Sequence, residues 1–109
     1  MNAPNIRRWQ DEFLGEPSEA FLKHFFIPPT AYRVSKSLYT VGTRFAGFMH
    51  QGTVYVLDGS CSYDLGCTEV HLSKADFVEL PTGEYMFSVE GDRPVELVRV
   101  WKIDELFVK

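Results

Sequence analysis

Apolar and polar residues alternate in short runs along most of this chain, and a turn signal follows most of the runs. From residue 32 onward, the alternation and the β-branched and aromatic content predict strands at residues 32–37, 38–41, 44–49, 54–57, 60–64, 68–72, 77–80, 85–89 and 95–103. Asp58-Gly59 and Pro81-Thr82-Gly83 are typical of the tight turns that end strands. This many short strands predicts an all-β barrel or sandwich.

Two of these segments carry more specific expectations. Residues 60–64 and 68–72 should form a hairpin around Leu65-Gly66. Residues 95–103 are apolar at nearly every position, so we expect this strand to be covered on both faces. An immunoglobulin-type sandwich fits less well, because the spacing of the Cys and Trp residues is wrong for that fold.

The first forty residues follow a different pattern. Residues 17–26 predict one short helix with Phe21, Leu22 and Phe25 on a single face, and Ser18 or Glu16 can cap its start. The following Ile-Pro-Pro ends the helix, because proline cannot donate a backbone hydrogen bond. We therefore predict a single domain, in which an N-terminal segment (1–38) packs its helix on a β-barrel core (39–109).

Composition excludes several classes of protein. The 109 residues are 45% hydrophobic, with nine Phe, five Tyr and two Trp, which argues against disorder. The net charge is −4, and Lys and Arg are scattered, so a nucleic-acid partner is not expected. No apolar run has membrane-spanning length, and the N-terminus does not read as a secretory signal. A cytoplasmic location is the default expectation.

The two cysteines, Cys61 and Cys67, lie on either side of the predicted hairpin. A disulfide between them requires the turn to centre near Asp64, where the two would face each other. Reduced thiols are the favoured interpretation for a cytoplasmic protein. A metal site that combines both cysteines with His71 is conceivable, but the spacing matches no zinc pattern.

The turns and their separation resemble the two sequence motifs of the cupin family, over residues 39–101. Gly59 stands where the first motif ends in glycine, and Pro81 and Gly83 stand at the Pro-x-Gly of the second motif. Ala75 occupies the position of the leading glycine of the second motif, with the habitual aspartate after it. The resemblance implies a single-domain cupin-type jelly-roll β-barrel with a short N-terminal helix.

The same resemblance implies that the usual cupin metal centre is missing. Cupins hold a metal with three His and usually a Glu, a ligand set that suits Fe, Mn, Ni, Cu or Zn. These positions fall on residues with no suitable donor, namely Gly52, Met86, and either Ala46 and Phe48 or, with a longer spacing, Phe45 and Gly47. We therefore expect neither a metal nor another cofactor.

If the resemblance holds, strand alternation places one set of residues inside the barrel. The even-numbered positions from Ala46 to Val56 share one face, and Met86 and Ser88 face them from the second motif. The predicted cavity is apolar, and His50 is its main polar group. The expected ligand-binding residues are Phe48, His50, Gly52, Val54, Met86 and Ser88.

The leading functional hypothesis is a metal-free cupin that binds a small organic ligand. One alternative is a metal-free isomerase, epimerase or lyase that acts on a sugar or small acid with His50 as base, in which Tyr85 or Tyr63 could take part. Another is a homodimeric interaction or regulatory protein. Four further residues carry a binding role only as the minority interpretation and are more typical of surface positions: His24, His71, Arg44 and Arg99, of which the arginines could hold a carboxylate or phosphate.

Overall fold

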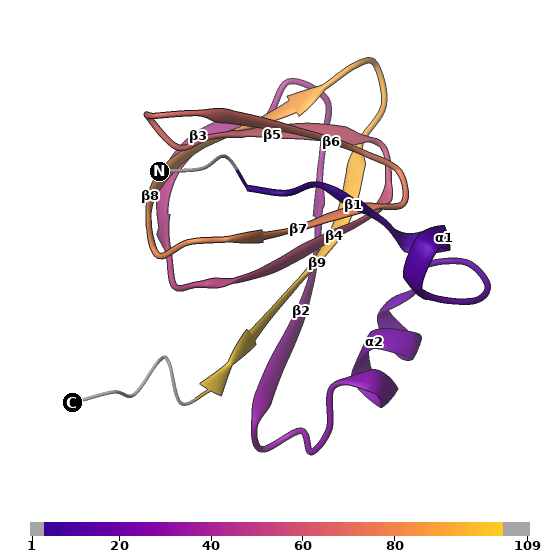
Figure 1. Cartoon of the computed structure of the whole chain (residues 1–109). Helices are drawn as coiled ribbons and strands as arrows, with labels where there is room; N and C mark the ends of the chain where they lie inside the picture. Colours follow the sequence, from indigo (N-terminus) through magenta and orange to yellow (C-terminus); the bar gives the residue numbers. More distant parts are fainter. Residues whose placement is uncertain (1–3, 104–109) are drawn as a thin grey trace.

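The computed structural model describes residues 4–103, which form two antiparallel sheets that face each other (Figure 1). One sheet has five strands in the order β1-β7-β4-β9-β2, and the other has four in the order β3-β8-β5-β6. This confirms the predicted all-β barrel. The strands are β1 (Arg7–Arg8), β2 (Tyr32–Tyr39), β3 (Arg44–Met49), β4 (Gly52–Asp58), β5 (Ser60–Asp64), β6 (Glu69–Ser73), β7 (Asp76–Leu80), β8 (Gly83–Glu90) and β9 (Val95–Lys102).

The central strands of the five-stranded sheet bury side chains on both faces. On β4, Val54 and Val56 point into the barrel, whereas Tyr55 points out of it. On β9, Leu97 points inward and Val98 outward, and both are fully buried. The prediction that the last strand is covered on both faces is therefore confirmed. Each face has a separate apolar core.

The inner core fills the space between the two sheets. Its three buried aromatic residues stand on the four-stranded sheet, and its aliphatic side chains come from both sheets. Phe87 lies at the centre of the aromatic part, with ring centroids 4.9 Å from Tyr39 and 5.2 Å from Tyr63. The buried members are Val54, Val56, Cys61, Tyr63, Val70, Leu72, Val78, Leu80, Tyr85, Phe87, Val95 and Leu97.

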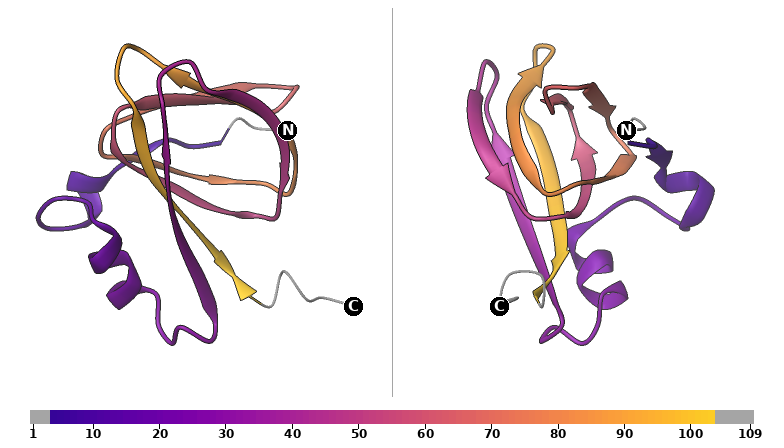
Figure 2. Two further views of the ribbon diagram at one scale, coloured as in Figure 1. Left: turned by 180° about the vertical axis from the view of Figure 1, so that it is seen from behind. Right: turned by 60° about the vertical axis from the view of Figure 1, so that its left-hand side comes forward.

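The outer core lies between the five-stranded sheet and the N-terminal segment, whose helices lie on the outside of the barrel (Figure 2). Helix α2 (Glu19–Phe25) lies within the predicted range 17–26. Ser18, one of the two predicted caps, accepts a hydrogen bond from the Phe21 amide through its hydroxyl at 3.1 Å. Strand β1 and helix α1 (Trp9–Glu12) were not predicted. They fix Trp9, which is 1% exposed and donates its indole N–H to the Gly15 carbonyl at 3.1 Å.

The predicted boundary between the N-terminal segment and the barrel does not coincide with the end of a strand. Residues 32–37 and 38–41 were predicted as two strands, but Tyr32–Tyr39 is one strand that pairs with β9 along its whole length. The predicted boundary after residue 38 therefore lies within a strand of the barrel. The covering segment ends before β2.

The hairpin of β5 and β6 has its predicted turn at Leu65-Gly66, where the Leu65 amide bonds the Thr68 carbonyl at 2.8 Å. The turn is not centred on Asp64, so Cys61 pairs with Leu72 instead of facing Cys67. Cys61 is a buried free thiol. Burial raises the pKa of this thiol to about 12, which keeps it protonated and unreactive near neutral pH.

The turn residues that carry the sequence motifs adopt backbone conformations that favour glycine. Gly59 has φ 81°, and a Cβ atom there would lie 2.3 Å from the Pro94 carbonyl oxygen, so this position requires glycine. Ala75 has φ 73°, the only non-glycine residue of the described range with a positive φ. Its left-handed conformation explains why the motif elsewhere has glycine at this point.

Trp9 should be one of the most important residues of the outer core for stability. We expect Trp9→Ala to lower the free energy of unfolding by about 3–5 kcal/mol, because it empties a fully enclosed aromatic site. Urea denaturation measures this loss. Leu14→Ala is the matched control, since Leu14 is 93% exposed and should change stability by no more than about 0.5 kcal/mol. Equal effects of the two variants would contradict the described packing of the N-terminal segment.

Candidate functional site

The face of β3 that was predicted to point into the barrel points out of it. Phe48 is 62% exposed, whereas Phe45 and Met49 pack against the inner core. The prediction assumed that the alternation of inward and outward side chains on β4 continues through residues 50 and 51 into β3. That step fails because β3 and β4 belong to opposing sheets, and the connection between them changes which parity points inward.

The same reversal holds on β8. Tyr85 and Phe87 are buried in the inner core, so Met86 and Ser88 point away from it. The prediction that Met86 and Ser88 line the cavity is therefore wrong in orientation. Tyr85 lies inside the barrel, with its hydroxyl directly over Gly47 of the paired strand.

The remaining predicted site residues are not gathered in one place. Val54 points into the barrel, as predicted, but it is fully buried in the inner core. Gly52 is buried where β4 meets β9, and a Cβ atom there would lie 2.8 Å from the Val100 carbonyl oxygen. His50 is exposed outside the barrel, where its ring makes an edge contact with the Phe48 ring at 5.8 Å. The structure therefore does not unite these residues in a cavity.

The polar group inside the barrel is Arg99 instead. It lies two positions after Leu97 on β9 and so points to the same inner face. Its Nη2 atom donates to the Ser37 hydroxyl at 3.1 Å and to the Tyr39 hydroxyl at 2.9 Å, both on β2. The side chain is half-buried, so part of it remains accessible.

Tyrosines surround this guanidinium. Burial alone would lower the pKa of Arg99, but the electrostatic influence of Tyr63, Tyr39 and Tyr85 outweighs it and raises the pKa. Burial also raises the pKa of Tyr63. Arg99 is therefore a permanent cation, and Tyr63 stays neutral at physiological pH. We call Ser37, Tyr39, Tyr63, Tyr85 and Arg99 the Arg99 site.

Two N–H groups, one in the Arg99 site and one beside it, have no hydrogen-bond acceptor among the described residues, and the guanidinium has no counter-charge among them. The Nε atom of Arg99 is buried and has no hydrogen-bond partner within residues 4–103. The same is true of the indole nitrogen of Trp101, which follows on the same face of β9. No carboxylate of the described residues forms an ion pair with Arg99. A buried donor without a partner costs about 1–3 kcal/mol, and more where it is charged.

The residues at the expected metal positions do not form a metal centre. With the longer motif spacing, the first two histidine positions fall on Phe45 and Gly47, which are the inward positions of β3. Neither side chain can donate to a metal. Within the part of the chain that the structure describes, no three His, Cys, Asp or Glu side chains converge on a point where a metal could bind.

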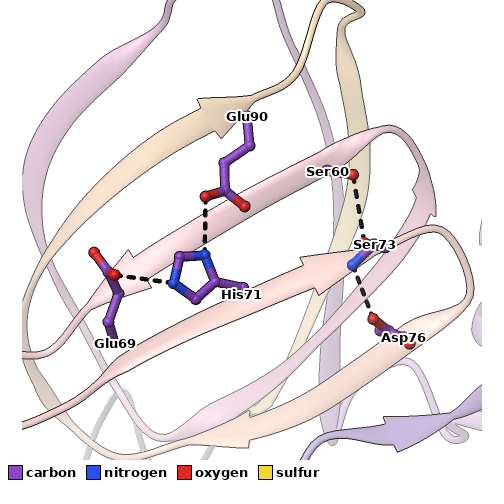
Figure 3. Close-up of polar contacts among 6 residues, drawn as sticks. All are labelled: Ser60, Glu69, His71, Ser73, Asp76 and Glu90. Atoms are coloured by element: carbon purple, nitrogen blue, oxygen red, sulfur yellow. Dashed lines mark hydrogen bonds and ion pairs between the residues drawn. The ribbon is translucent and has the colours of Figure 1, made fainter.

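A second polar cluster lies on the outer face of the four-stranded sheet (Figure 3). His71 is exposed there, as predicted, and bridges two carboxylates: its Nδ1 lies 2.9 Å from Glu90 and its Nε2 lies 2.9 Å from Glu69. Glu90, followed by Glu69, raises the pKa of His71. The carboxylates contact the two ring nitrogens separately, so they favour the protonated form of His71 and do not converge on a single point.

Comparison with solved structures identifies the fold as cupin-type. Protein NMB1881 from Neisseria meningitidis superposes with a TM-score of 0.58 at 8% identity, over 70% of this chain and 78% of that one. The cupin domain of Cnp3 from Schizosaccharomyces pombe gives 0.60 at 15% identity, over 74% and 59%. The EutQ protein of Clostridium difficile gives 0.51 at 20% identity, over 62% and 55%.

These similarities concern the fold alone, because the sequences have diverged far. The chain spans little more than half of the length of the EutQ and Cnp3 structures. No family profile and no curated protein matches the sequence. None of the helices described here is long and apolar enough to cross a membrane.

The carboxylates around His71 predict a measurable titration. We expect NMR to give His71 a pKa above 6.5, and Glu90→Gln to lower it more than Glu84→Gln, a control on the same strand. Because the folded-state pKa is the higher one, the stabilisation is complete below the unfolded pKa and disappears as pH rises through the folded pKa. A His71 pKa at or below 6.5 would contradict the bridged geometry.

Proposed function

We propose that this cupin-type barrel binds a small organic ligand through an anionic group held by Arg99, without a bound metal. One observation carries the proposal: a half-buried guanidinium inside an apolar barrel has no carboxylate partner among the described residues. An enclosed charge without a counter-charge is costly, and a ligand anion would remove that cost. Ligand binding would therefore account for a cation at this position, whereas packing of the apolar core does not.

The hydrogen bonds of Arg99 favour binding of an anion. Ser37 and Tyr39 hold Nη2 from the neighbouring strand, which fixes the guanidinium plane before a ligand arrives. The Nε–H, which has no partner, remains available to donate to a carboxylate oxygen, whereas both hydrogens of Nη2 are used by Ser37 and Tyr39. Trp101 adds a second free donor on the same face of β9.

A carboxylate fits this site better than a phosphate. Phosphate sites in proteins gather several cations or a cluster of backbone N–H groups at a helix terminus or glycine-rich loop. Here a single arginine is surrounded by hydroxyl groups and aromatic rings. The ligand class proposed is therefore a small carboxylic acid whose apolar part meets the aromatic wall of the barrel.

The alternative hypotheses are less well supported. His50 is exposed and its ring contacts the ring of Phe48 edge-on, so His50 is not placed for acid–base catalysis on a ligand in the barrel. The homodimer stays a prediction, for which light scattering at micromolar concentration is the test. The absence of a bound metal also stays a prediction, and elemental analysis of the purified protein tests it.

Replacing Arg99 should separate binding from stability. We expect Arg99→Met to weaken benzoate binding at least tenfold in isothermal titration calorimetry, because the cation is lost, while the melting temperature without ligand stays the same or rises. Benzamide, which has the same shape but no charge, should bind wild type no better than the variant. Arg99→Lys should keep part of the affinity, since charge remains and the fork is lost.

Arg93→Met is the matched control for these titrations. Arg93 is exposed and pairs with Asp58 at 2.9 Å outside the barrel, so its loss should leave benzoate binding unchanged. A screen of small carboxylates by thermal shift extends the test beyond benzoate. The proposal fails if no small carboxylate binds the wild-type protein, or if Arg99→Met binds as tightly as wild type.

His50→Ala addresses the alternative directly. Because His50 lies outside the barrel, we expect this variant to bind benzoate within about twofold of wild type, which corresponds to less than about 0.5 kcal/mol. A loss of affinity as large as that of Arg99→Met would place the ligand at the β3–β4 connection and support the hypothesis of a site around His50.

A further inference from the structure

A pocket opens on the outer face of the five-stranded sheet, at the end of the N-terminal segment that packs on this face. Helix α2 ends at Phe25, and Phe26 forms the rim of a cavity of about 210 Å³ over the ends of β4, β7 and β9. Its lining includes Phe26, Tyr32, Thr53, Glu79, Val100 and Lys102. Val100 and Tyr32 belong to the outer core, so this part of the pocket lies on the opposite face of β9 from Arg99, and Trp101 borders the pocket as well.

Two opposite charges flank this pocket. Glu79 stands on β7 and Lys102 on β9, with β4 between them. Adjacent strands lie about 4.8 Å apart, and Lys102 lies two residues beyond Val100, which is level with Glu79, so the two backbones are separated by about 12 Å. No ion pair joins either residue to a charged side chain within residues 4–103. Glu79 accepts one hydrogen bond, from the side-chain Nε2 of Gln51 at 3.3 Å.

The surface between the two charges is partly apolar. Val100 is buried beneath the pocket, the Phe26 ring closes one side of it, and Gly52 contributes no side chain at the strand end. Pockets for drug-sized ligands occupy about 300–1,000 Å³, so this smaller cavity suits a molecule of the size of one amino acid. Opposite charges at its two ends complement a molecule that carries both signs.

We infer that this pocket binds a small zwitterion, such as a free aliphatic amino acid. The ligand ammonium group faces Glu79, its carboxylate faces Lys102, and its aliphatic part lies against Phe26 and Val100. A ligand with one charge satisfies only one end of the pocket, and exposed single charge pairs contribute little to affinity. This site is separate from the Arg99 site, so either can exist without the other.

Three matched probes test the inference: L-norvaline, pentanoate and butylamine, which share an aliphatic chain and carry both charges, the carboxylate alone, or the ammonium alone. We expect norvaline to bind at least about tenfold more tightly to this pocket than either relative in ligand-observed NMR and calorimetry. Glu79→Gln should abolish the preference over pentanoate. Lys102→Met should abolish the preference over butylamine.

Lys36→Met and Glu96→Gln serve as matched controls. These residues form an exposed ion pair at 3.3 Å between β2 and β9, away from the pocket, so their loss should leave norvaline binding unchanged. Arg99→Met should also leave norvaline binding to the outer pocket unchanged, while it weakens binding of benzoate inside the barrel. Melting temperatures confirm that each variant is folded.

Two outcomes would overturn the inference. One is that none of the three probes binds in a manner sensitive to Glu79 or Lys102. The other is that norvaline and pentanoate bind equally and both lose affinity on Arg99→Met, which would assign all binding to the Arg99 site. Binding of carboxylates at Arg99 with no zwitterion in the outer pocket would leave the proposed function intact.

Discussion

The arrangement depends on one constraint, which is that the five-stranded sheet must be covered on both faces. Its central strands β4 and β9 bury apolar side chains inward and outward in alternation, so neither face can meet water. The four-stranded sheet covers the inner face. The N-terminal segment covers the outer one (Figures 1 and 2). Its Trp9 packs against Tyr55, and its Phe13 packs against Phe77.

The same alternation gives β9 two chemical environments. Arg99 and Trp101 enter the barrel, whereas Val100 and Lys102 point to the outer face. Inside, a cation held by two hydroxyl groups faces aromatic rings and has no counter-charge among the described residues. Outside, the cover ends before the strand does, and a small pocket remains. A single strand therefore contributes to both proposed sites, and Trp101 borders both of them.

The sequence predicted most of the barrel because its signals are local. Strands, the hairpin turn and the Ser18 cap follow from alternation, turn residues and capping chemistry. The left-handed backbone of Ala75 gives a physical basis for the motif position it occupies. Strand β1 and helix α1 were missed, because elements of two and four residues are too short to show periodicity and depend on the contacts of Trp9.

The candidate site was harder to predict. Alternation tells which residues share a face within one strand, but it does not carry through a connection between opposing sheets, and this reversed the assignments of Phe48 and Met86. Arg99 was weighed as an anion ligand and set aside as a surface residue. A strand that is apolar on both faces gives no sign of which side an embedded arginine takes, so only the packing of β9 against both cores settles its place.

The most direct test of the account is anomalous diffraction from crystals of the protein soaked with 4-bromobenzoate and with its uncharged analogue, 4-bromobenzamide. The account predicts a bromine peak inside the barrel beside the Arg99 guanidinium, with the carboxylate on its Nε side, and no peak at that position with the analogue. A barrel that holds no 4-bromobenzoate, or peaks confined to surface cations such as Arg93, would contradict it.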